Sequence, residues 1–342
     1  MSSAPVNPLE VPPYQIQSLI SSVADAFGLP STIQVRCAQA LGSEIYIGGS
    51  EGQLIRFALQ ADNPHELQSY QILSHQTLPS NKPIEEIALI PSISRALVYS
   101  DRQIHFYTLP SLDPVPPTII KPIRNVVTFA IDHQHLRRPP AASTEPVEFC
   151  VIKRSSIALY SILERLTYQK EIPLPHPVFL ARRFGRALCV ADQHTYSIVD
   201  LEDASIFPLM PICQTESATQ LRPSINVVAD NEFLITSFAE GGTLGVFITG
   251  DGIPIRGTLQ WPSYPRSVCL DYPYVASLLP NDTIEIHNVD TQSIAQVIPA
   301  PSDSSPTLHP WLKLISCSNG YLVPSAQRSD KMGLTSVRLL RA

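Results

Sequence analysis

The stretch RALVYSDRQIHFYTLPSL, residues 95–112, consists of two apolar segments separated by a short polar break. Residues 96–99 and 104–107 contain aromatic and β-branched side chains, which fit a pleated, half-buried sheet surface. Residues 100–103 carry residue types that form turns. The stretch therefore predicts a β-hairpin, in which two antiparallel strands are joined by a tight turn.

The same arrangement recurs along the chain. It is found in EIYIGGSEGQLIRFAL (44–59), FCVIKRSSIALYSI (149–162), LCVADQHTYSIVDL (188–201) and PYVASLLPNDTIEIHNV (273–289). Each copy is preceded by one further apolar segment and is usually followed by another, in a unit of about 40–50 residues, which is the size of a propeller blade. We therefore expect an all-β fold, a seven-bladed β-propeller of four-stranded blades, formed by residues 1–342 as a single domain.

Two segments need separate treatment. The last unit offers only three strands, and YQIQSLI (14–20) precedes the first unit without another assignment. We expect this N-terminal strand to close the last blade, because an unpaired blade edge invites edge-to-edge association. The proline-containing segment 132–146 has few apolar residues to anchor it and is expected to be a flexible loop.

The composition sets limits on function and location. The chain has 342 residues, of which 44% are hydrophobic and 16% are charged, so it can bury a substantial core. It has no apolar run near the roughly 20 residues of a membrane-spanning helix and no signal-peptide pattern at its start, so we expect a soluble, non-secreted protein. A net charge of −6 argues against nucleic-acid binding, which needs a basic face. The six cysteines form no C-x-x-C pair and are expected to be reduced thiols, mostly buried.

No catalytic or cofactor-binding constellation stands out. GGSEGQ (48–53) resembles a phosphate-binding loop, but it lacks the Lys-Ser/Thr ending and opens a strand, so it predicts a hairpin turn. The nine histidines show no metal-ligand spacing, and no Ser-His-Asp set can be proposed. We therefore expect no metal, no cofactor and no enzyme activity.

Among the polar residues, the arginines show the clearest pattern along the sequence. In a four-stranded blade, the loop between the first and second strands lies at the opposite end of the ring from the hairpin between the second and third. In three consecutive units this loop is expected to hold Arg95, Arg137, Arg138, Arg182, Arg183 and Arg186. These side chains are either scattered surface charges or a docking patch for an acidic protein surface or lipid headgroups.

The sequence also resembles a known family. GTLQWPSYPRSVCLDYPYVASLLPNDTIEIHNVDTQSIAQVI (257–298) is similar to the citron homology (CNH) domain of the vacuolar-sorting tethering proteins, as are residues 97–112 and 188–212. KPIRNVVTFAID (121–132) looks most like the fungal CORVET subunit related to transforming-growth-factor-β-receptor-associated protein. The turn at Asp101–Arg102 departs from the family because it lacks glycine. Members place this propeller ahead of an α-solenoid, so the resemblance implies that the 342 residues are the N-terminal part of a longer chain.

The resemblance implies a non-catalytic protein-interaction module of an endosomal tether. Its partners would be a Rab-family GTPase and other tether subunits, and it would be cytoplasmic and peripheral on endosomal or vacuolar membranes. It would act in Rab-dependent endosome fusion and in endosome-to-vacuole transport. Two alternatives remain open: the equivalent propeller of the HOPS tether, or a propeller hydrolase or ligand-binding enzyme. The enzyme would need polar groups at the channel mouth, where Glu85, Glu86 and Asp271 are the obvious carboxylates of the innermost strands.

Overall fold

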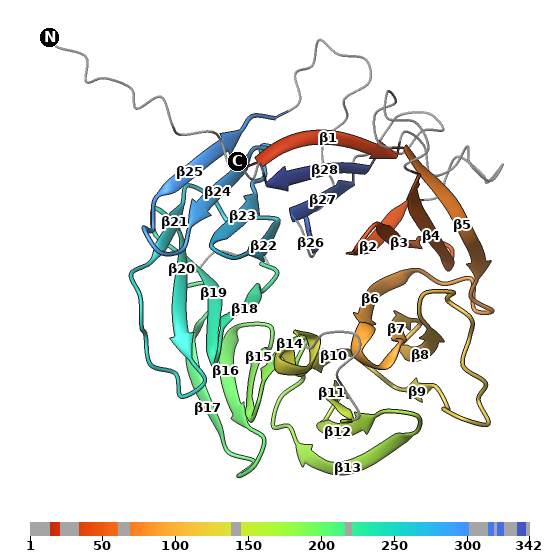
Figure 1. The fold of residues 1–342 in the computed structure, drawn as a ribbon. Coiled ribbons are helices and arrows are strands. Elements are labelled where there is room, and N and C mark those ends of the chain that lie inside the picture. Colours follow the sequence, from red (N-terminus) through yellow and green to blue (C-terminus); the bar gives the residue numbers. More distant parts are fainter. Residues whose placement is uncertain are drawn as a thin grey trace, which may run out of the picture.

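The computed structural model describes residues 14–20, 34–60, 69–137, 145–215, 221–300, 314–317, 320–324 and 334–339. Their strands form seven antiparallel four-stranded sheets arranged in a ring (Figure 1). The helical elements of these residues are short: the 3-10 helix η2 (Pro91–Ile93) and α1 (His133–Leu136). No helix among these residues is long and apolar enough to cross a membrane.

Six of the sheets consist of four strands that are consecutive in the sequence. The first contains β2 (Val35–Leu41), β3 (Glu44–Gly49), β4 (Gln53–Gln60) and β5 (Ser69–Thr77). The second contains β6 (Ile84–Ile90), β7 (Arg95–Ser100), β8 (Gln103–Thr108) and β9 (Ile123–Arg124). The third contains β10 (Thr128–Ile131), β11 (Val147–Ile152), β12 (Ser156–Ile162) and β13 (Leu166–Pro173).

The next three sheets follow the same order. The fourth contains β14 (Leu180–Phe184), β15 (Ala187–Ala191), β16 (Thr195–Asp200) and β17 (Ile206–Pro211). The fifth contains β18 (Ile225–Ala229), β19 (Glu232–Ala239), β20 (Gly242–Thr249) and β21 (Leu259–Trp261). The sixth contains β22 (Ser267–Asp271), β23 (Tyr274–Leu278), β24 (Ile284–Asn288) and β25 (Ile294–Ile298).

The remaining sheet combines the two ends of the chain. It contains β26 (Ile315–Cys317), β27 (Gly320–Pro324), β28 (Leu334–Leu339) and β1 (Tyr14–Ile20). β1 lies antiparallel to β28, with Tyr14 opposite Leu339 and Ile20 opposite Leu334. Six of the seven sheets are thus continuous four-strand repeats along the chain, and the seventh reaches four strands only because β1 joins β26, β27 and β28.

The hairpin of residues 95–112 forms as the sequence predicts. β7 and β8 pair from Arg95 opposite Thr108 to Ser100 opposite Gln103. Asp101 and Arg102 both have positive φ angles, of 48° and 57°. A two-residue hairpin turn with positive φ at both positions has the twist that suits the flanking strands. Asp tolerates this region better than most residues, which explains how the turn forms without glycine.

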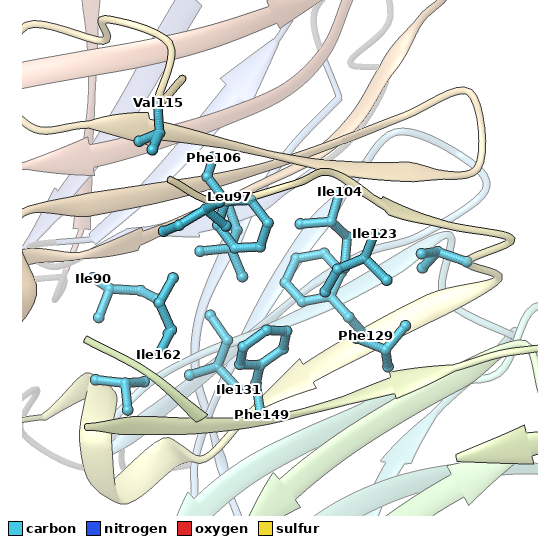
Figure 2. Close-up of a cluster of buried hydrophobic side chains, with 14 residues drawn as sticks. Ile90, Leu97, Ile104, Phe106, Val115, Ile123, Phe129, Ile131, Phe149 and Ile162 are labelled. Atoms are coloured by element: carbon cyan, nitrogen blue, oxygen red, sulfur yellow. The ribbon is translucent and has the colours of Figure 1, made fainter. Parts of the chain in front are cut away.

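The apolar core lies between neighbouring sheets. One cluster joins the sheet β6–β9 to the sheet β10–β13, and Figure 2 shows Leu97, Ile104 and Phe106 facing Phe129 and Phe149. All five side chains are at most 3% exposed. Because each strand alternates its side chains between two faces, both faces of a central strand such as β11 pack against a neighbouring sheet. The ring is therefore held by a succession of such clusters, and its two ends carry the turns.

Candidate functional site

The predicted arginines do not all lie in turns. Arg95 begins β7, Arg137 follows α1, and Arg186 lies in the turn between β14 and β15. Arg182 and Arg183 belong to the strand β14, and Arg95 belongs to β7, so the predicted placement of these three residues in loops is wrong. RRFGR reads as a turn because of Gly185, but the strand continues as far as Phe184. Arg138 lies outside the described residues.

Arg183 is the centre of a buried ion cluster. Its side chain is 5% exposed, and its guanidinium pairs with the carboxylates of Asp132, at 3.6 Å, and Glu148. Its Nε also donates to the carbonyl oxygen of Gly185 at 2.8 Å. Burial alone would lower the pKa of Arg183, but Cys150, Asp132 and Glu148 together raise it, so the group stays charged. A buried charge is tolerated only when it is paired in this way.

Asp132 connects this cluster to α1. It precedes the helix, and its Oδ1 accepts from the backbone N–H of Gln134 at 3.0 Å and of Gly185 at 3.1 Å. Asp132 and Arg183 also form an isolated parallel β-bridge between the ends of β10 and β14. The beginning of the segment 132–146, expected to be a flexible loop, is thus a capped helical turn fixed to the next sheet. Residues 138–144 lie outside the described residues.

Two other predicted arginines form ion pairs on the same end of the ring. Arg137, 46% exposed, pairs with Asp230 at 3.1 Å. Arg186, 57% exposed, lies 3.5 Å from Asp200 and 3.8 Å from Asp251, which belong to two different sheets. These contacts offset much of the positive charge that a docking patch for acidic partners requires. The docking role of the arginines stays a prediction.

The carboxylates of the innermost strands are also paired. Glu85 forms an ion pair with Arg36 at 3.1 Å. Glu86 lies 3.9 Å from Arg182. Asp271 accepts a hydrogen bond from the hydroxyl of Tyr14 at 3.0 Å. These contacts link the second sheet to the first and the fourth, and the sixth sheet to the last. Among the described residues, no group of His, Cys, Asp and Glu has an arrangement that could hold a metal ion.

The region between η2 and α1 contains buried polar atoms that lack a partner. They are the Oγ of Ser92, the Nε of Arg95 and the Nδ1 of His133. Burial, with Arg137 and Arg182 nearby, lowers the pKa of His133 to about 4. His133 is therefore neutral near pH 7, and protonating it introduces a charge into an already positive, poorly solvated setting.

This environment predicts an acid-sensitive contribution to stability. The pKa of His133 falls from 6.5 to about 4 on folding, so between these values the unfolded chain binds more protons than the folded chain. Above pH 6.5 the neutral ring makes its full contribution to the free energy of unfolding. As the pH falls toward 4, the free energy of unfolding decreases by about 2–3 kcal/mol. Urea unfolding at pH 7 and pH 4.5 measures this loss. A His133→Gln variant should lose less stability over the same interval, and an equal loss in both proteins would contradict the assignment.

One cluster was missed by the sequence analysis. Arg256 contacts both carboxylate oxygens of Glu232, at 2.6 and 3.1 Å, and also contacts Asp290 at 3.1 Å. The hydroxyl of Tyr272 donates to the same oxygen of Asp290 at 2.8 Å. These residues come from the fifth and sixth sheets. No local motif marks them, because the partners of Arg256 are separated from it by 24 and 34 positions.

Comparison with known proteins places the chain in a family. A family model described as the VPS3 N-terminal domain matches residues 30–300. Transforming growth factor-beta receptor-associated protein 1 from Mus musculus is 26% identical over 78% of this chain and 30% of its own length. Vacuolar protein sorting-associated protein 3 from Saccharomyces cerevisiae is 24% identical over 86% of this chain and 28% of its own length. The chain thus spans under a third of the length of these two relatives.

Solved structures show the same fold at low sequence identity. The AfRom2 CNH domain matches with a TM-score of 0.63 and 15% identity, over 96% of this chain and 100% of that domain. The Neurospora crassa Pan2 WD40 domain matches with a TM-score of 0.65 and 10% identity, over 95% of this chain and 96% of that domain. These likenesses support the propeller fold, and the family match covers most of the chain. The chain belongs to the VPS3 N-terminal domain family.

Proposed function

We propose that this chain is a non-catalytic interaction module of a vacuolar-sorting tethering complex. The observation that carries the proposal is the family match over residues 30–300, together with the alignment of 86% of the chain to the Saccharomyces cerevisiae protein. The name of that protein refers to vacuolar protein sorting. A propeller alone would not support this role, because the same fold serves many functions.

The geometry of the ring is compatible with a binding role. The three carboxylates of the innermost strands, which an enzyme site would use, are engaged with Arg36, Arg182 and Tyr14. Polar and apolar side chains are instead presented by turns at one end of the ring, where Arg137 and Arg186 lie. Turns held by a rigid scaffold are common locations for binding residues.

The finer proposal concerns partners and location. We propose a CORVET-like complex, in which the module contacts other tether subunits and an active Rab-family GTPase. It would act in endosome fusion and in transport from endosome to vacuole, as a cytoplasmic protein held peripherally on endosomal or vacuolar membranes. This proposal draws on the resemblance of residues 257–298 and 121–132 to the CNH domains of such tethers.

Copurification with Rab-family GTPases tests this role. Purified chain is incubated with immobilised endosomal Rab proteins locked in the GTP-bound or the GDP-bound form, and the retained protein is quantified. We expect the GTP-locked form to retain at least about tenfold more, because an effector discriminates by a difference in binding free energy between the two states. Equal retention by both forms would contradict Rab dependence.

A matched pair of variants then tests the arginine surface. Arg137→Glu with Arg186→Glu changes two exposed side chains, whereas Arg102→Glu with Arg154→Glu changes two exposed arginines in hairpins at the other end of the ring. If the predicted arginines contact an acidic partner, only the first pair should reduce Rab retention. Equal effects of the two pairs would leave Arg137 and Arg186 as ordinary surface charges.

A further inference from the structure

We infer that one end of the ring, over the fourth to sixth sheets, binds a basic amphipathic helix of a partner protein. The surface consists of the exposed carboxylates Glu202, Asp230, Asp251 and Asp290 and the exposed apolar side chains Ile253, Ile255 and Tyr272. We call it the acidic-apolar surface. Its ligand is opposite in charge to the one expected for the predicted arginine patch.

Contacts between turns show that the surface is continuous. Asp251, in the loop that follows β20, lies 3.8 Å from Arg186 in the turn of the fourth sheet. The N–H of the adjacent Gly250 donates to the carbonyl oxygen of Asn231 at 3.0 Å. The same loop reaches the sixth sheet through Arg256 and Asp290 at 3.1 Å. The loop after β20 is therefore the centre of the surface and joins its other parts.

Negative charge exceeds positive charge here. Six carboxylates take part in the ion pairs of this end: Asp200, Glu202, Asp230, Glu232, Asp251 and Asp290. Four cations contact them or their backbone: Arg137, Arg186, Arg256 and Lys170. Asp200 and Glu232 are largely buried, but Glu202, Asp230 and Asp251 are 72%, 85% and 63% exposed, more than the most exposed of the three arginines, Arg186, at 57%. Such an excess attracts a basic ligand and repels an acidic one.

Exposed apolar side chains lie among these charged residues. Ile253 is 60% exposed and Ile255 is 47% exposed, both between Asp251 and Arg256 in the central loop. Tyr272 is 52% exposed and is held in place by its hydrogen bond to Asp290. Exposed apolar groups rimmed by charged residues are typical of protein interaction sites, and tyrosine is enriched in them.

Together these features select the chemistry of the ligand. A helix with an apolar stripe flanked by lysine or arginine would cover the isoleucines and place its cations beside the exposed carboxylates. Anionic lipid headgroups carry the wrong charge for this surface. The inference does not depend on the proposed tether role, because it needs only the charges and the exposed side chains of this end.

A peptide titration tests the inference. The probe is a fluorescent 14-residue peptide of leucine and lysine, with leucines at helical i, i+3, i+4 and i+7 spacing, titrated with purified chain by fluorescence anisotropy. We expect saturable binding that weakens as salt is added. Asp251→Lys and Ile253→Ser should each raise the dissociation constant by about tenfold or more. Arg186→Glu should not weaken binding.

Matched controls separate this site from general attraction to an acidic protein. Glu240→Lys makes the same kind of charge change in the β19–β20 hairpin, at the other end of the fifth sheet. Leu73→Ser removes an equally exposed apolar side chain, 54% exposed, from β5. Both control variants should bind the peptide within about twofold of the parent. Absence of peptide binding, or equal losses in the control and test variants, would overturn the inference, whatever the outcome of Rab copurification.

Discussion

Replacing Arg183 with alanine is expected to lower the free energy of unfolding by about 3–5 kcal/mol. The substitution leaves the side chain of Asp132, which is 4% exposed, with its buried charge uncompensated, and it also unpairs Glu148. Removing one member of a buried ion pair is costly because the remaining charge has neither water nor a counter-ion. Urea or guanidinium unfolding of parent and variant, followed by circular dichroism, measures the effect.

Arg186→Ala is the matched control for this prediction. It removes an arginine three positions away, but its side chain is 57% exposed and its partners keep access to water. Exposed pairs contribute little, so the loss should be no more than about 1 kcal/mol. Equal losses in the two variants would contradict the assignment of Arg183 as a buried tie between β10 and β14.

This difference changes how the arginine hypothesis has to be tested. The sequence analysis places all six arginines in loops, where a substitution usually changes stability little. The structure places Arg183 in a strand, almost fully buried. A combined charge reversal that includes Arg183 would therefore unfold the protein and report nothing about docking. Only exposed positions such as Arg137 and Arg186 are suitable for that experiment.

The hairpins were predictable because their signal is local. Apolar and polar residues alternate over short segments, and turn-forming residues separate them, as at residues 95–108. The partner of β1 was predictable for a different reason. Tyr14–Ile20 has a strand pattern, and the last unit lacks an outer strand, so pairing with β28 follows from the need to cover an edge.

The polar contacts could not be predicted in the same way. Arg183 and Glu148 are separated by 35 positions, and the pairing of Arg256 with Asp290 spans 34. Which charges meet depends on the relative placement of turns from different sheets, and no local pattern encodes it. RRFGR shows the consequence, because the side chain of Arg182 is 34% exposed and that of the adjacent Arg183 only 5%. The acidic-apolar surface was missed for the same reason.

Removal of residues 1–20 is expected to cause the largest loss of folded protein. β1 supplies a complete antiparallel partner for β28, and Tyr14 is 2% exposed. The Tyr14 ring packs edge-to-face on Tyr274 with centroids 5.7 Å apart. The side-chain amide of Gln296 accepts a hydrogen bond from the backbone N–H of Tyr14 and donates one to the carbonyl oxygen of Tyr14, both at 2.9 Å. Deletion therefore exposes the edge of β28 and uncovers part of the sixth sheet. An open edge of this kind pairs with other chains.

The claim that the two ends of the chain meet in one sheet is central to this account, since the ring and its surfaces depend on it. It is tested most directly by size-exclusion chromatography with light scattering on two deletion variants at equal concentration. A variant lacking residues 1–13 keeps β1 and should elute with the mass of the parent. A variant lacking residues 1–20 should form larger species or fail to yield folded protein. If the second variant instead has the parent's mass and the parent's unfolding midpoint, β1 does not close the ring.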